Sequence, residues 1–250
     1  MRSHLRLGRH ILGLAAMSYG VIDLVWHQVT SLGGISHPNI LVYIMVMLEF
    51  IGGLTLQFRR TSKIGAVVLC VVFLVFSLYL LPPILQTPLV FAPWGNFFEE
   101  FSILVGGFLV LASTVLSDRK IAAKVEQVAY ISFGICVVTY ALYQLLYLTY
   151  TASLVPKWIP PGQMFWAIAT TIAFALAAIA VLSNHSALLA SWLLTAMLTL
   201  FGLLIWVPAC IIHPHTLDNW TENAQNLSIA GTAWIAAEYL SKRKSTKPVL

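Results

Sequence analysis

The stretch Ile64–Leu85, IGAVVLCVVFLVFSLYLLPPIL, contains no charged side chain. About 20 apolar residues in a helix cross the ~30 Å hydrocarbon core of a bilayer, so this stretch alone predicts a membrane-spanning helix. The whole chain has the same character, because 59% of its 250 residues are hydrophobic and 9% are charged. A soluble chain averages about 25% charged residues and cannot hide so much apolar surface. The sequence therefore predicts an all-α polytopic membrane protein.

Seven other apolar stretches have a similar length, and polar or proline-containing segments separate them. Together with Ile64–Leu85 they predict eight transmembrane helices. The seven are His10–Thr30, Asn39–Phe58, Phe97–Leu116, Val128–Thr151, Met164–Leu182, Leu188–Ile212 and Ala224–Leu240.

The basic residues divide unevenly between the two faces of this arrangement. With eight spans, Lys157 is on one face and every other lysine and arginine is on the face that carries both termini, whereas an odd number of spans would scatter them. The positive-inside rule then predicts cytoplasmic termini, and we expect a bacterial inner membrane. Because the bases are few and lie between apolar runs, the net charge of +5 does not indicate nucleic-acid binding.

The second half of the chain repeats features of the first half. A shift of 126 residues places Pro82 on Pro208, Pro88 on Pro214, Trp94 on Trp220, Ser102 on Ser228 and Ile103 on Ile229. Near the start, a shift of 121 places Gly13 on Gly134, Tyr19 on Tyr140 and Asp23 on Gln144. The pattern predicts two four-helix membrane repeats, 1–122 and 123–250, in the same orientation, related by an axis along the membrane normal.

Pro82 and Pro208 fall inside the third predicted helix of each repeat. Proline has no N–H to donate and clashes with the preceding turn, so we expect a kink or a break at both positions. Paired breaks at equivalent depth often mark a cavity.

Three motifs resemble those of DoxX-like membrane proteins. Leu154–Gly162, LVPKWIPPG, which leads into Phe165-Trp166, resembles their first-loop signature. Trp220–Leu227, WTENAQNL, followed by Ala230-Gly231, resembles their fourth helix, and Glu49–Gly53, EFIGG, resembles the pattern of their second helix. The resemblance implies two DoxX-like units of four helices. Members of the family include a subunit of a thiosulfate:quinone oxidoreductase, and fold analogy alone does not give a function.

Polar residues at membrane depth are the candidate functional residues, because an ionisable side chain there costs at least ~2.5 kcal/mol on insertion scales. The first repeat has Asp23 and Glu49 where the second has Gln144 and, near the equivalent place, Ile172. Asp23 and His27 are four residues apart and would share a helix face, either as a proton relay or as a structural hydrogen-bonded pair. Glu49 is either functional or a neutral carboxyl that is hydrogen-bonded across the bundle.

A second polar set is predicted at the outer face. Glu99, Glu100, Trp94 and Trp220 are candidate ligand-binding residues there, although tryptophans at matching positions are also typical of an interfacial aromatic belt. His213 and His215 are weak candidates for metal binding, and a polar loop explains them equally well. The other members are His37, Asn96, Asp218 and Glu222.

Several chemistries have no support in the sequence. Cys70, Cys136 and Cys210 each stand alone in an apolar run, which predicts buried thiols and no disulfide exchange. His27 is the only histidine well inside a predicted span, so paired-histidine haem ligation is not favoured. The motifs of zinc peptidases, P-loop proteins and serine hydrolases are absent.

Three functions stay open. We favour a membrane subunit that binds a hydrophobic small molecule, such as a quinone or lipid, or docks a membrane or peripheral redox subunit, with a pocket lined by Asp23, His27 and Glu49. The second is an integral-membrane enzyme that modifies a lipid or isoprenoid, with Asp23 or Glu49 as proton donor. The third is a transporter of small solutes or ions that uses the repeat symmetry. Whether the protein is an enzyme is left open.

Overall fold

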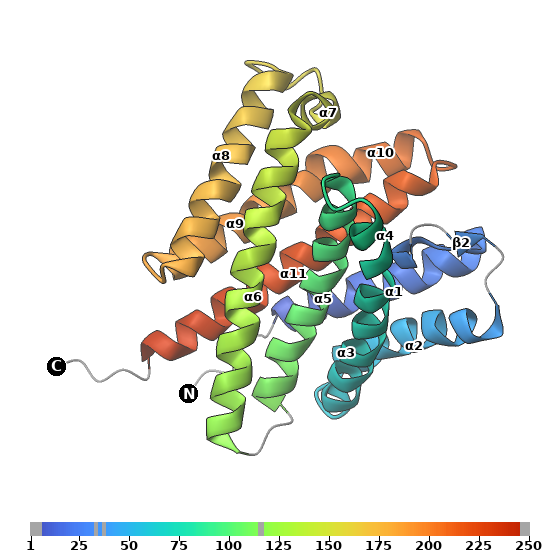
Figure 1. The fold of residues 1–250 in the computed structure, drawn as a ribbon, viewed down its shortest axis with the longest axis vertical. Helices are drawn as coiled ribbons and strands as arrows, with labels where there is room; N and C mark the ends of the chain where they lie inside the picture. Colours follow the sequence, from blue (N-terminus) through green and yellow to red (C-terminus); the bar gives the residue numbers. More distant parts are fainter. Residues whose placement is uncertain (1–6, 33–34, 37–38, 115–117, 246–250) are drawn as a thin grey trace.

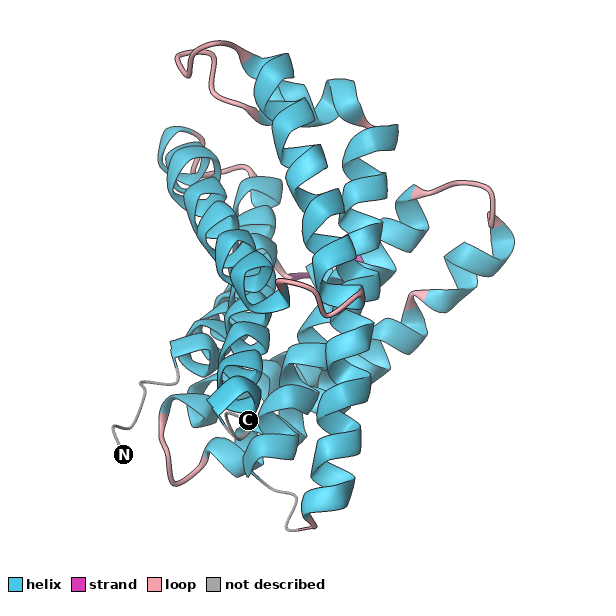
Figure 2. Ribbon diagram, turned by 90° about the vertical axis from the view of Figure 1, so that its left-hand side faces the viewer, coloured by secondary structure: helices cyan, strands magenta, loops and turns pink. Residues whose placement is uncertain are grey.

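The computed structural model describes residues 7–32, 35–36, 39–114 and 118–245, and helices make up nearly all of them (Figure 2). One short antiparallel pairing joins Gln28–Val29 (β1) to Ile35–Ser36 (β2). The helices are α1 (Leu7–Trp26), η1 (Thr30–Leu32), α2 (Ile40–Gln57), α3 (Ser62–Tyr79), α4 (Leu81–Gln86), α5 (Ala92–Thr114), α6 (Arg119–Leu146), α7 (Leu148–Leu154), α8 (Gln163–Leu182), α9 (Ala187–Phe201), the π-helical η2 (Gly202–Trp206), α10 (Val207–Ile212) and α11 (Leu217–Ser245).

Six helical segments in the described part of the chain are long and apolar enough to cross a membrane. They indicate an integral membrane protein, as the sequence predicts. The segments are Ile40–Gln57, Ser62–Gln86, Ala92–Thr114, Arg119–Leu146, Gln163–Leu182 and Ala187–Ile212.

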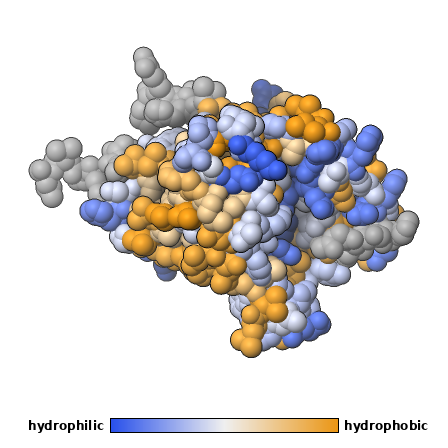
Figure 3. Space-filling model, turned by 90° about the horizontal axis from the view of Figure 1, so that it is seen from above, coloured by the Kyte–Doolittle hydropathy of each residue, from blue (hydrophilic) through white to orange (hydrophobic). Residues whose placement is uncertain are grey.

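The outer surface of these segments is apolar. Ile40, Leu85 and Ile211 are each more than two-thirds exposed, and Figure 3 shows hydrophobic side chains over much of one face of the molecule. Contiguous apolar surface on this scale is typical of contact with lipid.

Helices α1 and α11, which are not among these six segments although both were predicted to span the membrane, lie against each other in the middle of the fold (Figure 1). They run antiparallel, and glycines let their backbones approach closely: a Cβ on Gly231 would lie 2.7 Å from the backbone nitrogen of Leu12. Small residues at helix contacts are the usual means of close packing between membrane helices. Four contacts along the two helices define their register. They join Gly8 to Ile235, Leu12 to Gly231, Tyr19 to Gln225, and Trp26 to Trp220.

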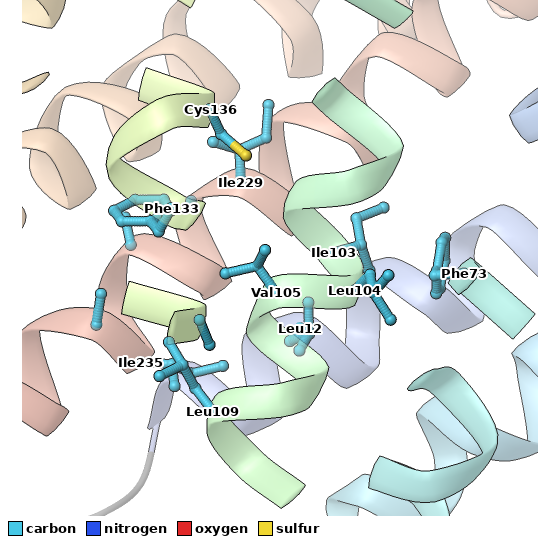
Figure 4. Close-up of a cluster of buried hydrophobic side chains, with 14 of the residues drawn as sticks. Leu12, Phe73, Ile103, Leu104, Val105, Leu109, Phe133, Cys136, Ile229 and Ile235 are labelled. Carbon is cyan, nitrogen blue, oxygen red and sulfur yellow. The ribbon is translucent and has the colours of Figure 1, made fainter. Parts of the chain in front are cut away.

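The core continues from this pair into α5, α6 and α3. Figure 4 shows Val105 of α5 between Leu12 of α1 and Phe133 of α6, Leu104 of α5 beside Phe73 of α3, and Leu109 beside Ile235 of α11. All of these side chains are buried. Cys136 and Cys70 are buried in the same core and Cys210 is buried elsewhere, all three as free thiols, as predicted.

The chain reverses direction between successive long helices. Gln57 of α2 bonds His10 of α1, Gly65 of α3 faces Gly52 of α2, and Gly95 of α5 faces Tyr143 of α6. Similar contacts join α6 to α8 and α9 to α11. The long helices therefore alternate in direction along the chain, in the order α1, α2, α3, α5, α6, α8, α9 and α11. The short helices α4, α7 and α10 consequently lie toward one end of the molecule (Figure 1).

Both predicted proline breaks are present. Helix α3 ends at Tyr79 and α4 begins at Leu81, with Pro82 in its first turn. Helix α9 passes through the π-helical η2 into α10, where Pro208 also occupies the first turn. A proline is tolerated in a first turn because the N–H that it lacks has no intrahelical acceptor there.

The segments after the two breaks have the same hydrogen bonds, 126 residues apart. The Trp94 indole donates to the Pro88 carbonyl at 3.2 Å, and the Trp220 indole donates to the Pro214 carbonyl at 2.9 Å. Two backbone hydrogen bonds are also 126 residues apart. The Thr87 nitrogen donates to the Pro83 carbonyl, and the His213 nitrogen donates to the Ala209 carbonyl.

Some predicted boundaries are wrong. Helix α6 begins at Arg119 rather than Val128, because the Asp118 carboxylate accepts from the backbone nitrogens of Lys120 at 2.7 Å and Ile121 at 3.2 Å and so caps a polar first turn. Helix α1 ends at Trp26, not Thr30, because His27 adopts a left-handed conformation with φ of 52°.

Candidate functional site

Five carboxyl groups from four helices gather near one end of the fold. Each lies within range of the charge of at least one other member, and together they form what we call the acid cluster. No lysine, arginine or histidine in the described ranges is hydrogen-bonded to any of the five. The members are Asp23 of α1, Glu49 of α2, Glu99 and Glu100 of α5, and Glu222 of α11.

Asp23 is held by the turn that follows α1. Its Oδ1 accepts from the Thr30 backbone nitrogen at 3.0 Å and from the Thr30 hydroxyl at 2.7 Å, while its buried Oδ2 has no partner. The two bonds fix η1 against α1 and bring Ser31 to the acid cluster, beside Glu100.

Glu49 and Glu100 are the least satisfied members of the acid cluster. Glu49 is 0% exposed and neither of its oxygens has a hydrogen-bond partner, and Glu100 is 6% exposed with an unpartnered Oε2. The hydrogen bond across the bundle that was one prediction for Glu49 does not form, because its neighbours Asp23 and Glu100 are also acceptors when ionised. Buried polar atoms without partners are rare in folded proteins and are concentrated at functional sites.

A cavity of about 150 Å³ adjoins the acid cluster. Eight of its nine lining residues are polar, and one of them, Gln225, is buried with an unpartnered side-chain nitrogen. The lining consists of Thr30, Ser31, Leu80, Asn96, Glu99, Glu100, Thr221, Glu222 and Gln225.

Tyr19 joins the inner carboxyls to this cavity. Its ring is fully buried, its hydroxyl donates to the Gln225 Oε1, and it lies within charge range of Glu49 and Glu100. Leu80 lines the cavity where α3 ends before the proline break, so one of the two predicted breaks does open onto a cavity.

The sequence analysis placed Asp23 and Glu49 in one polar set and Glu99 and Glu100 in another. The structure brings the two sets together. It does not bring His27 to them. The prediction that Asp23 and His27 share a face is wrong, because α1 ends at Trp26: the exposed His27 ring lies 3.4 Å from the Tyr43 hydroxyl, and Asp23 bonds Thr30 instead.

The tryptophan and histidine candidates lie outside the cavity lining. Trp94 stacks on Phe98 and Trp220 packs on Trp26. His213 and His215 are exposed, and within the described ranges no three His, Cys, Asp or Glu side chains are arranged to hold a metal ion. His37 lies outside the described residues.

Ile172, which the sequence places near the position equivalent to Glu49, is 53% exposed, whereas Glu49 is fully buried. Two residues further along the same helix, Phe174 is buried and packs on Tyr140.

Sequence reasoning missed Tyr19, Ser31 and Gln225 as site residues. Gln225 had a usable signal, because it stands three residues after Glu222 and so shares its helix face. Ser31 had none, because its position depends on where α1 ends.

The opposite end of α1 and α11 carries a second charged group of residues. Glu238 Oε1 accepts from the Gly8 backbone nitrogen at 3.3 Å, and a small cavity of about 30 Å³ adjoins Arg9, Glu126, Glu238 and Lys242. Here acids and bases are mixed, in contrast to the acid cluster.

Comparisons with known proteins add no relative: no protein-family model, no curated protein and no solved structure matches this chain.

Proposed function

We propose that the chain crosses the membrane eight times, as two tandem four-helix units with both termini on the cytoplasmic face. The alternating helix directions support the even number of crossings. The matched tryptophan bonds after the two breaks support the repeat. The DoxX-like resemblance is part of this proposal and rests on the sequence motifs alone.

In this arrangement the cavity lies where the two units meet. Asn96 and Glu99 of α5 correspond, at the shift of 126, to Glu222 and Gln225 of α11, and all four residues line the cavity. The same cavity therefore receives equivalent turns of both units, and α5 packs directly on α11. Binding sites at repeat interfaces are common in membrane proteins.

We propose that the cavity binds a small organic cation whose N–H groups donate to the acid cluster. The observation that carries this proposal is that three carboxyl groups, those of Glu99, Glu100 and Glu222, line one polar cavity, and that the buried Oε2 of Glu100 has no partner there. An unpaired carboxyl at membrane depth is costly, so its retention indicates a ligand that donates hydrogen bonds and brings positive charge.

The second unit supports a functional role for these acids. The counterpart of Asp23, Gln144, accepts from the hydroxyls of Thr170 and Thr171, both at 3.2 Å. The counterpart of Glu100, Asn226, donates to the Leu198 carbonyl at 2.9 Å. Neutral side chains with hydrogen bonds therefore serve the fold at these positions of the second unit, so an ionisable group is not required there.

An ammonium group fits the cluster better than a metal ion does. Metal ions need several oxygens converging at about 2.0–2.6 Å, and no such convergence occurs among the described residues. A cavity of about 150 Å³ has room for several heavy atoms, and N–H donors on an organic cation reach oxygens that are spread over its wall.

The test is the melting temperature of the purified protein in mild detergent, read with a thiol-reactive dye that labels the three buried cysteines on unfolding. Ethylammonium, sodium and choline chlorides are compared at equal total chloride. We expect ethylammonium to stabilise the protein most, by about 2.7 kcal/mol at a hundred times its Kd, because only it brings N–H donors.

The matched variants are Glu100→Gln in the cavity and Glu126→Gln at the opposite end. Glu100→Gln should lose the ethylammonium effect and Glu126→Gln should keep it. An equal response to the three salts, or an ethylammonium response that Glu100→Gln retains, contradicts the proposal.

A quinone or lipid headgroup is the second candidate ligand, and a redox subunit remains the proposed partner. One observation favours the headgroup: Leu80 lines the cavity and the adjoining segment exposes Leu85 and Leu89, which are 78% and 98% exposed, so a tail has an apolar surface to follow. A short-chain benzoquinone that stabilises the protein more than ethylammonium does would favour this candidate. The enzyme alternative is less supported, because Glu49 and Asp23 do not line the cavity.

A further inference from the structure

Gln225 of α11 lines the cavity and has a side-chain nitrogen without a hydrogen-bond partner. The side chain is 7% exposed, and its Oε1 accepts from the hydroxyl of the fully buried Tyr19. Tyr19 therefore holds the amide in one place, and the Nε2 keeps two N–H donors that nothing in the fold uses. A buried donor without an acceptor is costly, and a molecule in the cavity can supply the acceptor.

The cavity lining has one amide and one carboxyl at each of two positions that are equivalent in the proposed repeat. At the shift of 126, Asn96 of α5 corresponds to Glu222 of α11, and Glu99 corresponds to Gln225. The backbone is repeated at these positions, whereas the side-chain chemistry is exchanged between the units. The lining therefore distinguishes the two ends of a ligand that has a charged group at one end and a neutral polar group at the other.

The second group of such a ligand is neutral. Glu99, Glu100 and Glu222 line the cavity, and none of its described lining residues is a lysine, arginine or histidine. A carboxylate or phosphate on the ligand would be repelled by these three acids. Among neutral groups a hydroxyl both accepts and donates, so it suits the unpartnered Nε2 of Gln225 and the unpartnered Oε2 of Glu100.

We propose that the ligand is a small amino alcohol, and that Gln225 is the residue that selects for its hydroxyl group. The ammonium N–H groups donate to the carboxyls of the cavity, and the hydroxyl oxygen accepts from the Gln225 Nε2. A cavity of about 150 Å³ has room for a molecule of this size. This inference rests on the proposed function and adds to it the class of ligand and a residue that determines specificity.

The experiment compares ethanolammonium with propylammonium chloride. The two cations have the same charge and the same number of heavy atoms, and they differ in a hydroxyl in place of a methyl group. Their Kd values are obtained from the melting temperature of the purified protein in mild detergent at increasing ligand concentration. We expect the Kd of ethanolammonium to be about fivefold lower, as one added hydrogen bond gives. Glycine, which has a carboxylate in place of the hydroxyl group, should bind more weakly than both.

Gln225→Met tests the assigned residue, because methionine has a similar length and no N–H donor. The Kd values of ethanolammonium and propylammonium should become equal in this variant. Gln144→Met is the matched control: it is the same substitution outside the cavity lining, and it should retain the preference for ethanolammonium. If Gln225→Met does not fold because the Tyr19 hydroxyl loses its acceptor, the double variant Tyr19→Phe/Gln225→Met removes both groups and is expected to give the same result.

The wild-type protein alone can overturn the inference. Equal Kd values for the two cations, tighter binding of propylammonium, or tighter binding of glycine contradicts the amino alcohol and leaves the organic cation site standing. A preference for ethanolammonium that persists without the Gln225 amide contradicts the assigned residue. If neither cation binds, the proposed function and this inference are overturned together.

Discussion

Glu49 and Asp23 are neighbours in the acid cluster with opposite hydrogen-bonding states. Asp23 accepts two bonds from Thr30, whereas Glu49 accepts none. The first carboxyl therefore stabilises the turn after α1, and the second contributes no bond to the fold. At the level of single side chains, this contrast separates a carboxyl that is bonded within the fold from one that is not.

The contrast predicts opposite effects of the same substitution. Glu49→Leu should increase the free energy of unfolding by about 1–3 kcal/mol, because a buried group without hydrogen bonds is replaced by an apolar one of similar size. Asp23→Leu should decrease it by a similar amount, because the Thr30 nitrogen loses its acceptor. Melting temperatures of both variants check this, and a Glu49→Leu protein that melts well below the wild type would show that Glu49 stabilises the fold.

At the scale of helices, six of the eight predicted apolar segments are long and apolar enough to cross a membrane, and both predicted proline breaks are present. The predicted end of α1 is wrong, because the left-handed His27 follows from the bond between Asp23 and Thr30 and not from hydropathy. That one error moved His27 into the predicted site and left Ser31 out of it. Glu99 and Glu100 were predicted as part of an outer polar set. Their proximity to Glu49 could not be predicted, because it depends on the packing of α1 between α2 and α11.

The packing of α1 on α11 depends on Gly231. A Cβ there would meet the backbone of Leu12 at 2.7 Å, and backbone atoms cannot give way cheaply. We expect Gly231→Ala to destabilise the protein by about 1–3 kcal/mol through this overlap. Gly202→Ala is the matched control, because its Cβ would meet no backbone atom, only side-chain atoms of Asn226 at 3.1 Å and Asn223 at 4.0 Å. Equal melting temperatures for the two variants would contradict the close helix approach.

For the whole molecule, hydropathy and the placement of bases predict the class of protein and the orientation. They cannot predict the cavity, because it is formed by Thr30, Leu80, Asn96 and Thr221, which are distant in the chain and unremarkable in type. The 126-residue shift did align Trp94 with Trp220, and the structure gives both the same bond. The place where the units meet is thus readable from sequence only once a repeat is assumed.

The central claim is that a cation enters the cavity from the face opposite the termini. Cysteine labelling with a membrane-impermeant maleimide in intact cells tests it directly, since the three native cysteines are buried. Thr221→Cys reports on the cavity, and Lys120→Cys reports on the exposed start of α6. We predict that Thr221→Cys is labelled in intact cells and more slowly with ethylammonium present, whereas Lys120→Cys is labelled only after permeabilisation. Labelling of both positions from one face, or a Thr221→Cys rate that ethylammonium leaves unchanged, would contradict the account.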